Sequence, residues 1–159
     1  SGEMSNLIRA VSDSQQILEV IHAAFKRYEQ DPMPSSALVE TKATIEQELF
    51  DSVLMFGAEM DAQLVGVVKV KRLADHVYFS RLAVLPEFQK QGIARALVKF
   101  VEQFAKEEQM PTVRCKVRKS EKDNIRLYKK LGFHIAKEEV MTSPLGFVME
   151  TVTMDKEVE

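Results

Sequence analysis

Apolar and polar positions in the first part of the chain predict one strand followed by two helices. Residues 7–11 predict the strand, and Ser12 or Asp13 then suits the N-cap of a helix that runs to about Tyr28. A short second helix is expected over residues 41–51, after a two-proline loop at residues 30–36. The apolar positions expected to face the core are Ile17, Leu18, Ile21, Ala24, Phe25, Tyr28, Ile45, Leu49 and Phe50.

The rest of the chain predicts strands with two further helices between them. The helices are expected at residues 93–109 and 122–131, and the strands at 53–59, 64–72, 77–84, 112–117, 133–140 and 147–154. Residues 60–63 suit the turn of a hairpin, and residues 144–146 suit the turn between the last two strands. We expect residues 1–6 and the tail 155–159 to be frayed.

Length and composition fit a single soluble domain that spans residues 1–159. Hydrophobic residues make up 45% of the chain and charged residues 29%, which is ordinary for a globular protein. The formal net charge of −2 gives no basic footprint, so we expect no nucleic-acid partner. No apolar run is long enough to cross a bilayer and no signal-peptide pattern begins the chain, so we expect a cytoplasmic protein without a membrane partner.

The single cysteine, Cys115, permits no intrachain disulfide and fits a reducing compartment. It alternates with Val113 and Val117, which places it on the apolar face of a strand, so we interpret it as a packed thiol rather than a nucleophile. The three histidines are scattered, and no Cys/His spacing resembles a zinc site. We therefore expect no metal.

The segment from Leu82 to Val98 carries the most chemical information. An apolar strand leads through a proline bend and a short loop around Gly92 into a long helix. Such an arrangement aims unpaired backbone N–H groups and a partial positive charge at whatever lies beyond the strand end, which suits a phosphate. The alternative is an ordinary strand–turn–helix connection whose glycine only eases the bend.

The loop spacing selects among known phosphate loops. The dinucleotide fingerprint needs three glycines and the Walker loop needs Gly-Lys-Ser/Thr, and neither string occurs. What does occur is Gln89-x-x-Gly92-x-Ala94. It resembles the Gln/Arg-x-x-Gly-x-Gly/Ala signature of the GCN5-related N-acetyltransferases, the GNAT superfamily, in which this loop wraps the pyrophosphate of acetyl-CoA.

A second motif follows about thirty residues later. Tyr128-Lys129-Lys130-Leu131-Gly132-Phe133 resembles the Tyr-x-Lys-x-Gly-Phe ending of the same family, where the tyrosine often serves as general acid for the departing thiolate. Many members carry an asparagine seven residues before this tyrosine, where this chain has Glu121. Asn124 lies one turn closer and can share a helix face with Tyr128, so either residue could take the asparagine role.

The resemblance covers nearly the whole chain and implies an α/β fold, a three-layer αβα sandwich around a mixed, splayed sheet. It implies acetyl-CoA as co-substrate and Tyr128 as the catalytic acid. The main chain of residues 82–84 would contact the pantetheine arm, and the backbone N–H of Val84 would stabilise the oxyanion. The full implied cofactor set is Leu82, Ala83, Val84, Gln89, Lys90, Gln91, Gly92, Ile93, Ala94, Arg95, Asn124 and Tyr128.

The implied reaction is direct attack of a primary amine on the acetyl group through a tetrahedral intermediate. The acceptor, a small-molecule or peptide amine, would be bound mainly by residues 28–41, and its identity stays open, as does the choice between monomer and homodimer. Position alone suggests four candidates for the general base, although we expect each to be a solvated surface residue. These candidates are Tyr28, Glu40, Glu48 and His76.

Two other functions remain as alternatives. The same fold could serve as a non-catalytic acyl-CoA-binding sensor or scaffold, although cofactor binding alone does not need an acid beside the sulfur. An unrelated α/β protein that binds a phosphorylated ligand would explain the Gly92 loop but not the second motif.

Overall fold

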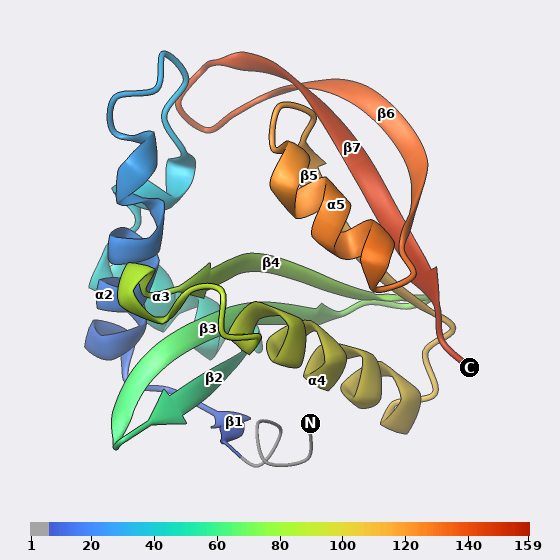
Figure 1. Ribbon diagram of the computed structural model, residues 1–159, viewed down its shortest axis with the longest axis horizontal. Coiled ribbons are helices and arrows are strands. Elements are labelled where there is room, and N and C mark those ends of the chain that lie inside the picture. The colour runs from blue at the N-terminus through green and yellow to red at the C-terminus, as the bar shows by residue number, and fades with distance from the viewer. Residues whose placement is uncertain (1–6) are drawn as a thin grey trace. The chain divides into compact units, whose positions relative to one another are not determined.

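The computed structural model describes residues 7–159, so the expectation for residues 1–6 lies outside the described part of the chain (Figure 1). Its helices are α2 (Ser14–Phe25), α3 (Lys42–Phe50), α4 (Ile93–Glu107) and α5 (Lys122–Lys130). Its strands are β1 (Ile8–Ala10), β2 (Leu54–Met60), β3 (Gln63–Arg72), β4 (Val77–Val84), β5 (Thr112–Arg118), β6 (His134–Thr142) and β7 (Val148–Glu157).

The strands form a mixed sheet in the order β1-β2-β3-β4-β5-β7-β6. β4 and β5 pair in parallel at Val77 and Tyr78, while β5, β7 and β6 pair antiparallel, as do β1, β2 and β3. This element order and mixed sheet confirm the predicted α/β class. The described chain divides into two compact units: unit 1 is residues 7–71 and 81–100, and unit 2 is residues 72–80 and 101–159. The single domain, the three layers and the splay of the sheet stay predictions.

The β2–β3 hairpin of unit 1 forms where the sequence predicts it. Asp61 and Ala62 connect the strands, and both have positive φ, 52° and 63°, as a two-residue hairpin turn requires. β3 is buried from Leu64 to Val70, which includes the charged Lys69. A strand covered on both faces reads as a continuous apolar run, so a lysine within it must find partners inside the protein.

The helices of unit 1 begin at side-chain caps. The Asp13 carboxylate accepts a hydrogen bond of 3.0 Å from the backbone N–H of Gln16 at the start of α2. The expected continuation of this helix to Tyr28 is a separate 3-10 turn, Lys26–Tyr28. Thr41 begins α3 by exchanging hydrogen bonds with Thr44, as in a capping box.

The predicted inward face of α3 is partly wrong. Ile45 is fully buried, but 85% of Phe50 is exposed. Five residues turn an α-helix through about 500°, so Phe50 points about 140° away from Ile45. Leu49, one turn after Ile45, is half-buried as the pattern requires.

In unit 2 the tail is ordered further than expected. β7 continues to Glu157, so the prediction of fraying from residue 155 is wrong through that position. The buried carboxylate of Asp155 accepts two hydrogen bonds from Arg114, at 2.8 Å and 3.0 Å, and raises the pKa of that guanidinium. Lys156 pairs with Glu102, so charged residues that look like a tail hold a strand in place.

Candidate functional site

The loop between β4 and α4 belongs to unit 1 and has two left-handed backbone positions. Lys90 has a φ of 63° and Gly92 a φ of 83°, and residues Gln89 to Gly92 are exposed. The Gln89 side-chain amide donates a hydrogen bond of 3.2 Å to the carbonyl oxygen of Val84, which joins the loop to the end of the strand. Gly92 therefore occupies a left-handed conformation, which glycine adopts without strain.

Gly92 also marks the N-terminus of α4. Its carbonyl oxygen accepts a hydrogen bond of 3.0 Å from the backbone N–H of Ala96, the first such bond of the helix. The N–H groups of Ile93, Ala94 and Arg95 precede that bond and so have no carbonyl partner within the helix. A Cβ built on Gly92 would meet no atom within 4 Å. The arrangement therefore leaves room for an anion where the helix supplies donors and positive potential, as a pyrophosphate requires.

The same helix packs closely against β3. A Cβ on Gly66 would lie 3.0 Å from Cγ2 of Ile93 and 3.1 Å from Cδ1 of Leu97. The Leu85 N–H donates to the Val65 carbonyl oxygen at 2.8 Å, which fixes the end of β4 beside β3. Because Gly66 has no Cβ, the start of α4 can pack closely against β3. A glycine within an apolar strand often marks such a close approach.

Tyr128 lies in unit 2, at the end of α5, and the capping geometry explains the spacing of its motif. The Phe133 N–H donates to the Tyr128 carbonyl oxygen at 2.9 Å, and the Gly132 N–H donates to the Lys129 carbonyl oxygen at 3.0 Å. With Gly132 at a φ of 97°, these bonds form a Schellman cap. Such a cap brings the side chains of its first and last residues together, here Tyr128 and Phe133.

An aromatic cluster fixes the tyrosine ring. The Tyr128 ring lies 5.6 Å from the Phe79 ring and 5.8 Å from the Phe133 ring, measured between centroids, and only 5% of the residue is exposed. A tyrosine on an amphipathic helix is expected to be half-buried, so this ring is more deeply buried than the helix pattern suggests. Because the Phe79 and Phe133 rings hold the Tyr128 ring, they limit the positions that its hydroxyl can take, as a catalytic acid requires.

The two candidates for the family asparagine contact each other. The Asn124 side-chain amide donates a hydrogen bond of 3.4 Å to the Glu121 carboxylate at the start of α5. Asn124 is half-buried one turn before Tyr128, so it lies on the side of the helix that the prediction gave it.

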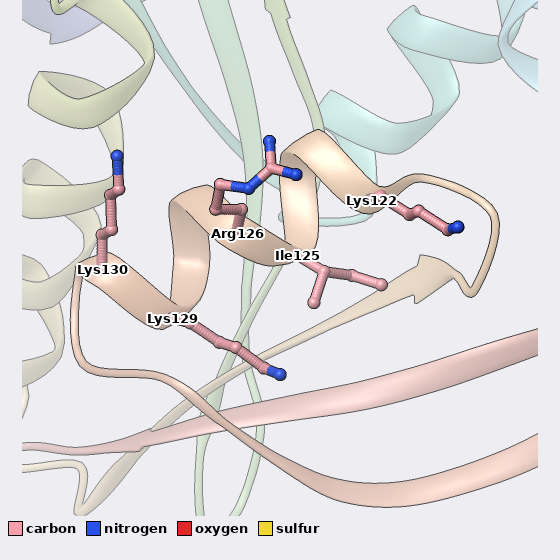
Figure 2. A pocket seen from close by; sticks show the side chains of 5 residues that line it. All are labelled: Lys122, Ile125, Arg126, Lys129 and Lys130. Carbon is pink, nitrogen blue, oxygen red and sulfur yellow. The ribbon is translucent and has the colours of Figure 1, made fainter.

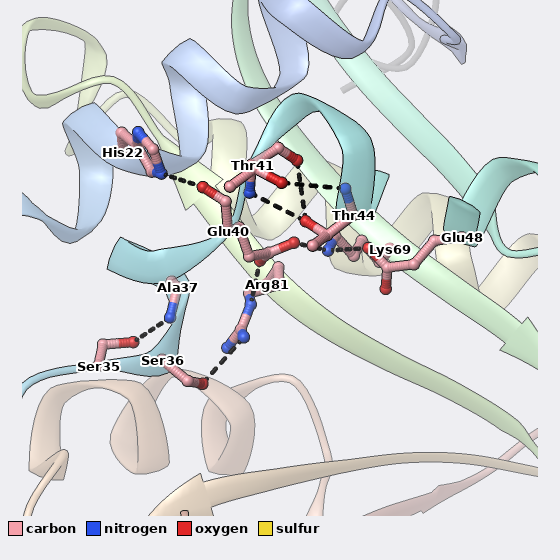
Figure 3. Close-up of polar contacts among 10 residues, drawn as sticks. All are labelled: His22, Ser35, Ser36, Ala37, Glu40, Thr41, Thr44, Glu48, Lys69 and Arg81. Atoms are coloured by element: carbon pink, nitrogen blue, oxygen red, sulfur yellow. Dashed lines mark hydrogen bonds and ion pairs between the residues drawn. The ribbon is translucent and has the colours of Figure 1, made fainter. Parts of the chain in front are cut away.

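The structure gives the four suggested base candidates different surroundings. Glu40 is paired with Lys69 and Arg81, and Glu48 also pairs with Lys69, so for Glu40 the expectation of a solvated surface role is wrong (Figure 3). Tyr28 accepts a hydrogen bond from Arg27, whose guanidinium stacks 4.4 Å from its ring. His76 shares a hydrogen bond of 2.7 Å with Asp75, which lowers the pKa of that carboxyl.

The cysteine is packed as predicted. Cys115 is buried, and burial raises the pKa of its thiol to about 12, so it stays protonated and unreactive at neutral pH. Among residues 7–159, no group of three or more histidine, cysteine, aspartate or glutamate side chains could hold a metal ion.

A pocket on the outer side of α5 carries positive charge (Figure 2). Arg126, whose guanidinium pairs with Asp123, lines it together with Lys122, Ile125, Lys129 and Lys130. The four cations are exposed, so their attraction for an anion is screened by salt. The four cations lie about 100° or more round the helix from Tyr128.

Sequence reasoning missed Lys69 and Arg81, which join residues 36–48 to β3 and β4. A lysine that interrupts an apolar run in a fully covered strand is a signal that could have identified Lys69. Nothing comparable marks Arg81, because its pairing partner Glu40 is 41 residues away in the sequence.

A family model and several solved structures match this chain. The model described as the Acetyltransferase (GNAT) family matches residues 16–133, more than half of the chain. Comparison with curated protein sequences finds no match. In the part of the chain that the structure describes, no helix has the length and apolar character needed to span a membrane.

Three solved structures have closely similar folds. The ribosomal-protein-S18-alanine N-acetyltransferase of Escherichia coli is 19% identical with a TM-score of 0.74, and the match covers 96% of this chain and 93% of that one. The PaiA N-acetyltransferase of Thermoplasma acidophilum, solved with coenzyme A, is 21% identical with a TM-score of 0.75, covering 94% and 97%. A GNAT family acetyltransferase of Elizabethkingia anophelis with acetyl-CoA bound is 20% identical with a TM-score of 0.70, covering 94% and 96%. At these identities the likeness shows the fold.

Proposed function

Because the chain belongs to the GNAT family of acetyltransferases, we propose that it transfers the acetyl group of acetyl-CoA to the nitrogen of a primary amine. The observation that carries this proposal is the start of α4. There the space beside Gly92 is open, and the backbone N–H groups of Ile93, Ala94 and Arg95 have no carbonyl partner within the helix. Anionic oxygens are stabilised at such a helix terminus, and acetyl-CoA carries a pyrophosphate.

The loop and strand residues would hold the donor. Lys90 and Arg95 would add positive charge beside the pyrophosphate, and the Gln89 side chain, bonded to the Val84 carbonyl oxygen, would keep the loop closed on it. Leu82, Ala83 and Val84 would bind the pantetheine arm through their main chain, with the Val84 N–H stabilising the oxyanion. Gln91 and Asn124 complete the proposed binding set.

Tyr128 would act as the general acid. The amine nitrogen bonds to the acetyl carbon and gives a tetrahedral intermediate, whose collapse breaks the carbon–sulfur bond. The departing thiolate takes up a proton that the tyrosine hydroxyl can donate, and the proton that the nitrogen loses passes to water and restores the hydroxyl. The Schellman cap and the Phe79 and Phe133 rings support this role because they hold the ring in one place. Glu40 is not assigned as the base, because its carboxylate already binds two cations.

The second candidate function is acyl-CoA binding without catalysis, which needs the loop but not an acid. The buried, capped Tyr128 favours catalysis over this alternative. A binding module would retain the affinity for acetyl-CoA and release no thiol with any amine.

A thiol-release assay tests the proposal. Wild-type protein, acetyl-CoA and a panel of amines are mixed, and free CoA is measured with a thiol reagent; the panel includes small amines, antibiotics and peptides with an N-terminal alanine. Cys115 is buried with a raised thiol pKa, so the protein itself contributes little signal. We expect amine-dependent release for at least one acceptor class. Thiol release that never depends on the amine would contradict the proposal.

Tyr128→Phe tests the acid. This variant keeps the ring that packs against Phe79 and Phe133 and removes only the hydroxyl. We expect unchanged affinity for acetyl-CoA and a turnover slower by roughly 100-fold or more, the usual contribution of a general acid. The matched control is Tyr78→Phe, on β4, which should leave both quantities unchanged. A Tyr128→Phe rate equal to wild type, with chemistry rate-limiting, would exclude the acid role.

A further inference from the structure

Arg81 has a left-handed backbone conformation inside β4. Its φ is 52°, although both flanking segments are extended strand and no glycine is present. L-residues with side chains avoid this region because Cβ comes too close to the following carbonyl oxygen. A strained residue persists only where its surroundings hold it, and such residues cluster at functional sites.

The change in backbone direction shows in the burial of β4. Val77 and Phe79 are buried and alternate with half-buried neighbours, as in a regular strand. After Arg81 the alternation stops, and Ala83 and Val84 are both buried. The alternation of burial therefore breaks at Arg81, the position where the backbone is left-handed.

Two side chains from residues 28–41, the segment expected to bind the acceptor, hold the Arg81 guanidinium (Figure 3). Its Nε donates a hydrogen bond of 2.6 Å to the Glu40 carboxylate, and its Nη2 donates one of 2.9 Å to the Ser36 hydroxyl. Ser36 begins the 3-10 turn Ser36–Val39, and Glu40 follows that turn directly. The fixed fork of a guanidinium makes such a two-point attachment geometrically specific.

Glu40 is itself immobilised. Its side chain is 9% exposed and also binds Lys69, which is 4% exposed and reaches Glu48 as well. The carbonyl oxygen of Glu40 lies 2.9 Å from Nε2 of His22, so its main chain is fixed too. Two carboxylates balance two cations, so the cluster has little net charge with which to attract or deprotonate an amine. These paired charges suit a role in holding the backbone in place.

We propose that Glu40 and Arg81 are positioning residues, and that their ion pair fixes the left-handed turn that aims Leu82, Ala83 and Val84 at the acyl donor. The inference rests on the proposed function, because it assigns these three residues to acetyl-CoA. The same ion pair ties the segment expected to bind the acceptor to the strand expected to bind the donor. All of these residues belong to unit 1.

Alanine and glycine at position 81 separate a backbone role from a charge role. Both substitutions, Arg81→Ala and Arg81→Gly, delete the guanidinium, but only glycine takes a left-handed φ without strain. We expect Arg81→Gly to bind acetyl-CoA nearly as tightly as wild type by calorimetry. Arg81→Ala should bind roughly fivefold or more weakly, because its backbone leaves the turn and binding must restore it.

A purely stabilising ion pair predicts a different result. Arg81→Gly and Arg81→Ala could then differ in stability, because a left-handed φ strains alanine and not glycine, but they would bind acetyl-CoA with equal affinity. Equal affinities of the two variants for acetyl-CoA would therefore overturn the proposal. Failure of the wild-type protein to bind acetyl-CoA would instead refute the proposed function, so the two failures are distinguishable.

Three further variants, at two positions, complete the design. Ser36→Ala removes one hydrogen bond from the guanidinium and leaves the buried charges paired, so it stays folded; we expect its affinity for acetyl-CoA to fall by a few-fold. Gln109 also has a left-handed φ, 58°, but it is an exposed residue of unit 2. Gln109→Ala and Gln109→Gly should differ in stability and bind acetyl-CoA equally. A difference in affinity between them as large as that at Arg81 would contradict the proposal.

Discussion

Replacing Gly92 with alanine separates the cost of a strained backbone from the loss of an anion site. Gly92 has a φ of 83° and Gly146, in the turn before β7, has a φ of 87°. A Cβ at either position would meet no atom within 4 Å. The two glycines are thus matched in conformation and in free space, and they differ in their proposed role, because only Gly92 begins α4.

The structure sets the expected magnitudes. A left-handed alanine costs about 1–2 kcal/mol, so both variants should unfold at temperatures roughly 2–8 °C below wild type. At Gly92 the new methyl group would also occupy space that the proposed pyrophosphate site needs. Loss of one hydrogen bond to a charged group costs about 1.5–3 kcal/mol, so the affinity for acetyl-CoA should fall roughly tenfold to 100-fold.

Thermal unfolding measures the first effect and calorimetric titration with acetyl-CoA measures the second. We expect Gly146→Ala to lose stability and keep its affinity, while Gly92→Ala loses both. Gly92→Glu, which adds bulk and negative charge, should abolish the rise in melting temperature that acetyl-CoA causes in wild type. Equal affinity in Gly92→Ala and Gly146→Ala would refute the assignment of this loop to the pyrophosphate.

Three other predictions concern packing. The Cys115 thiol, whose pKa burial raises to about 12, should resist alkylation in the native protein at mildly alkaline pH and react fully in denaturant; rapid native reaction would show that it is accessible. Ile45→Ala should lower the free energy of unfolding by about 2–5 kcal/mol, whereas Phe50→Ser should change it by less than about 0.5 kcal/mol, in urea titrations. Asp155→Asn should destabilise the protein by about 1–2 kcal/mol, because the Arg114 guanidinium loses a charged acceptor while its side chain stays 34% exposed to water; a neutral result would mean that β7 does not depend on this pair.

Short sequence patterns predict much of the fold, because contacts between residues close in the sequence determine the turns and helix ends. The Asp61–Ala62 turn and the Thr41 cap depend on residues within one turn of each other. The spacing from Tyr128 to Phe133 likewise follows from one helix cap, in which Gly132 supplies the left-handed residue. For this reason the sequence could predict the end of α5 beside Tyr128, whereas the proposed role of Tyr128 as an acid comes from the family resemblance.

Interactions between distant residues could not be predicted in the same way. The Glu40–Arg81 pair joins residues 41 apart, and Arg114–Asp155 also spans 41, so the sequence does not show that these charged residues are paired and partly buried. The left-handed Arg81 has no glycine to reveal it. The error at Phe50 was different, because the helical angle from Ile45 already places it outside the core stripe.

The most direct test of the central claim is the fate of the acetyl group itself. Wild-type protein is incubated with acetyl-CoA labelled isotopically in its acetyl group and with an amine that stimulates thiol release, and the products are analysed by mass spectrometry. We predict that the label appears on the amine nitrogen in amounts equal to the CoA released, and that Tyr128→Phe slows its appearance. Acetyl-CoA that binds while its label never reaches an amine would contradict the account.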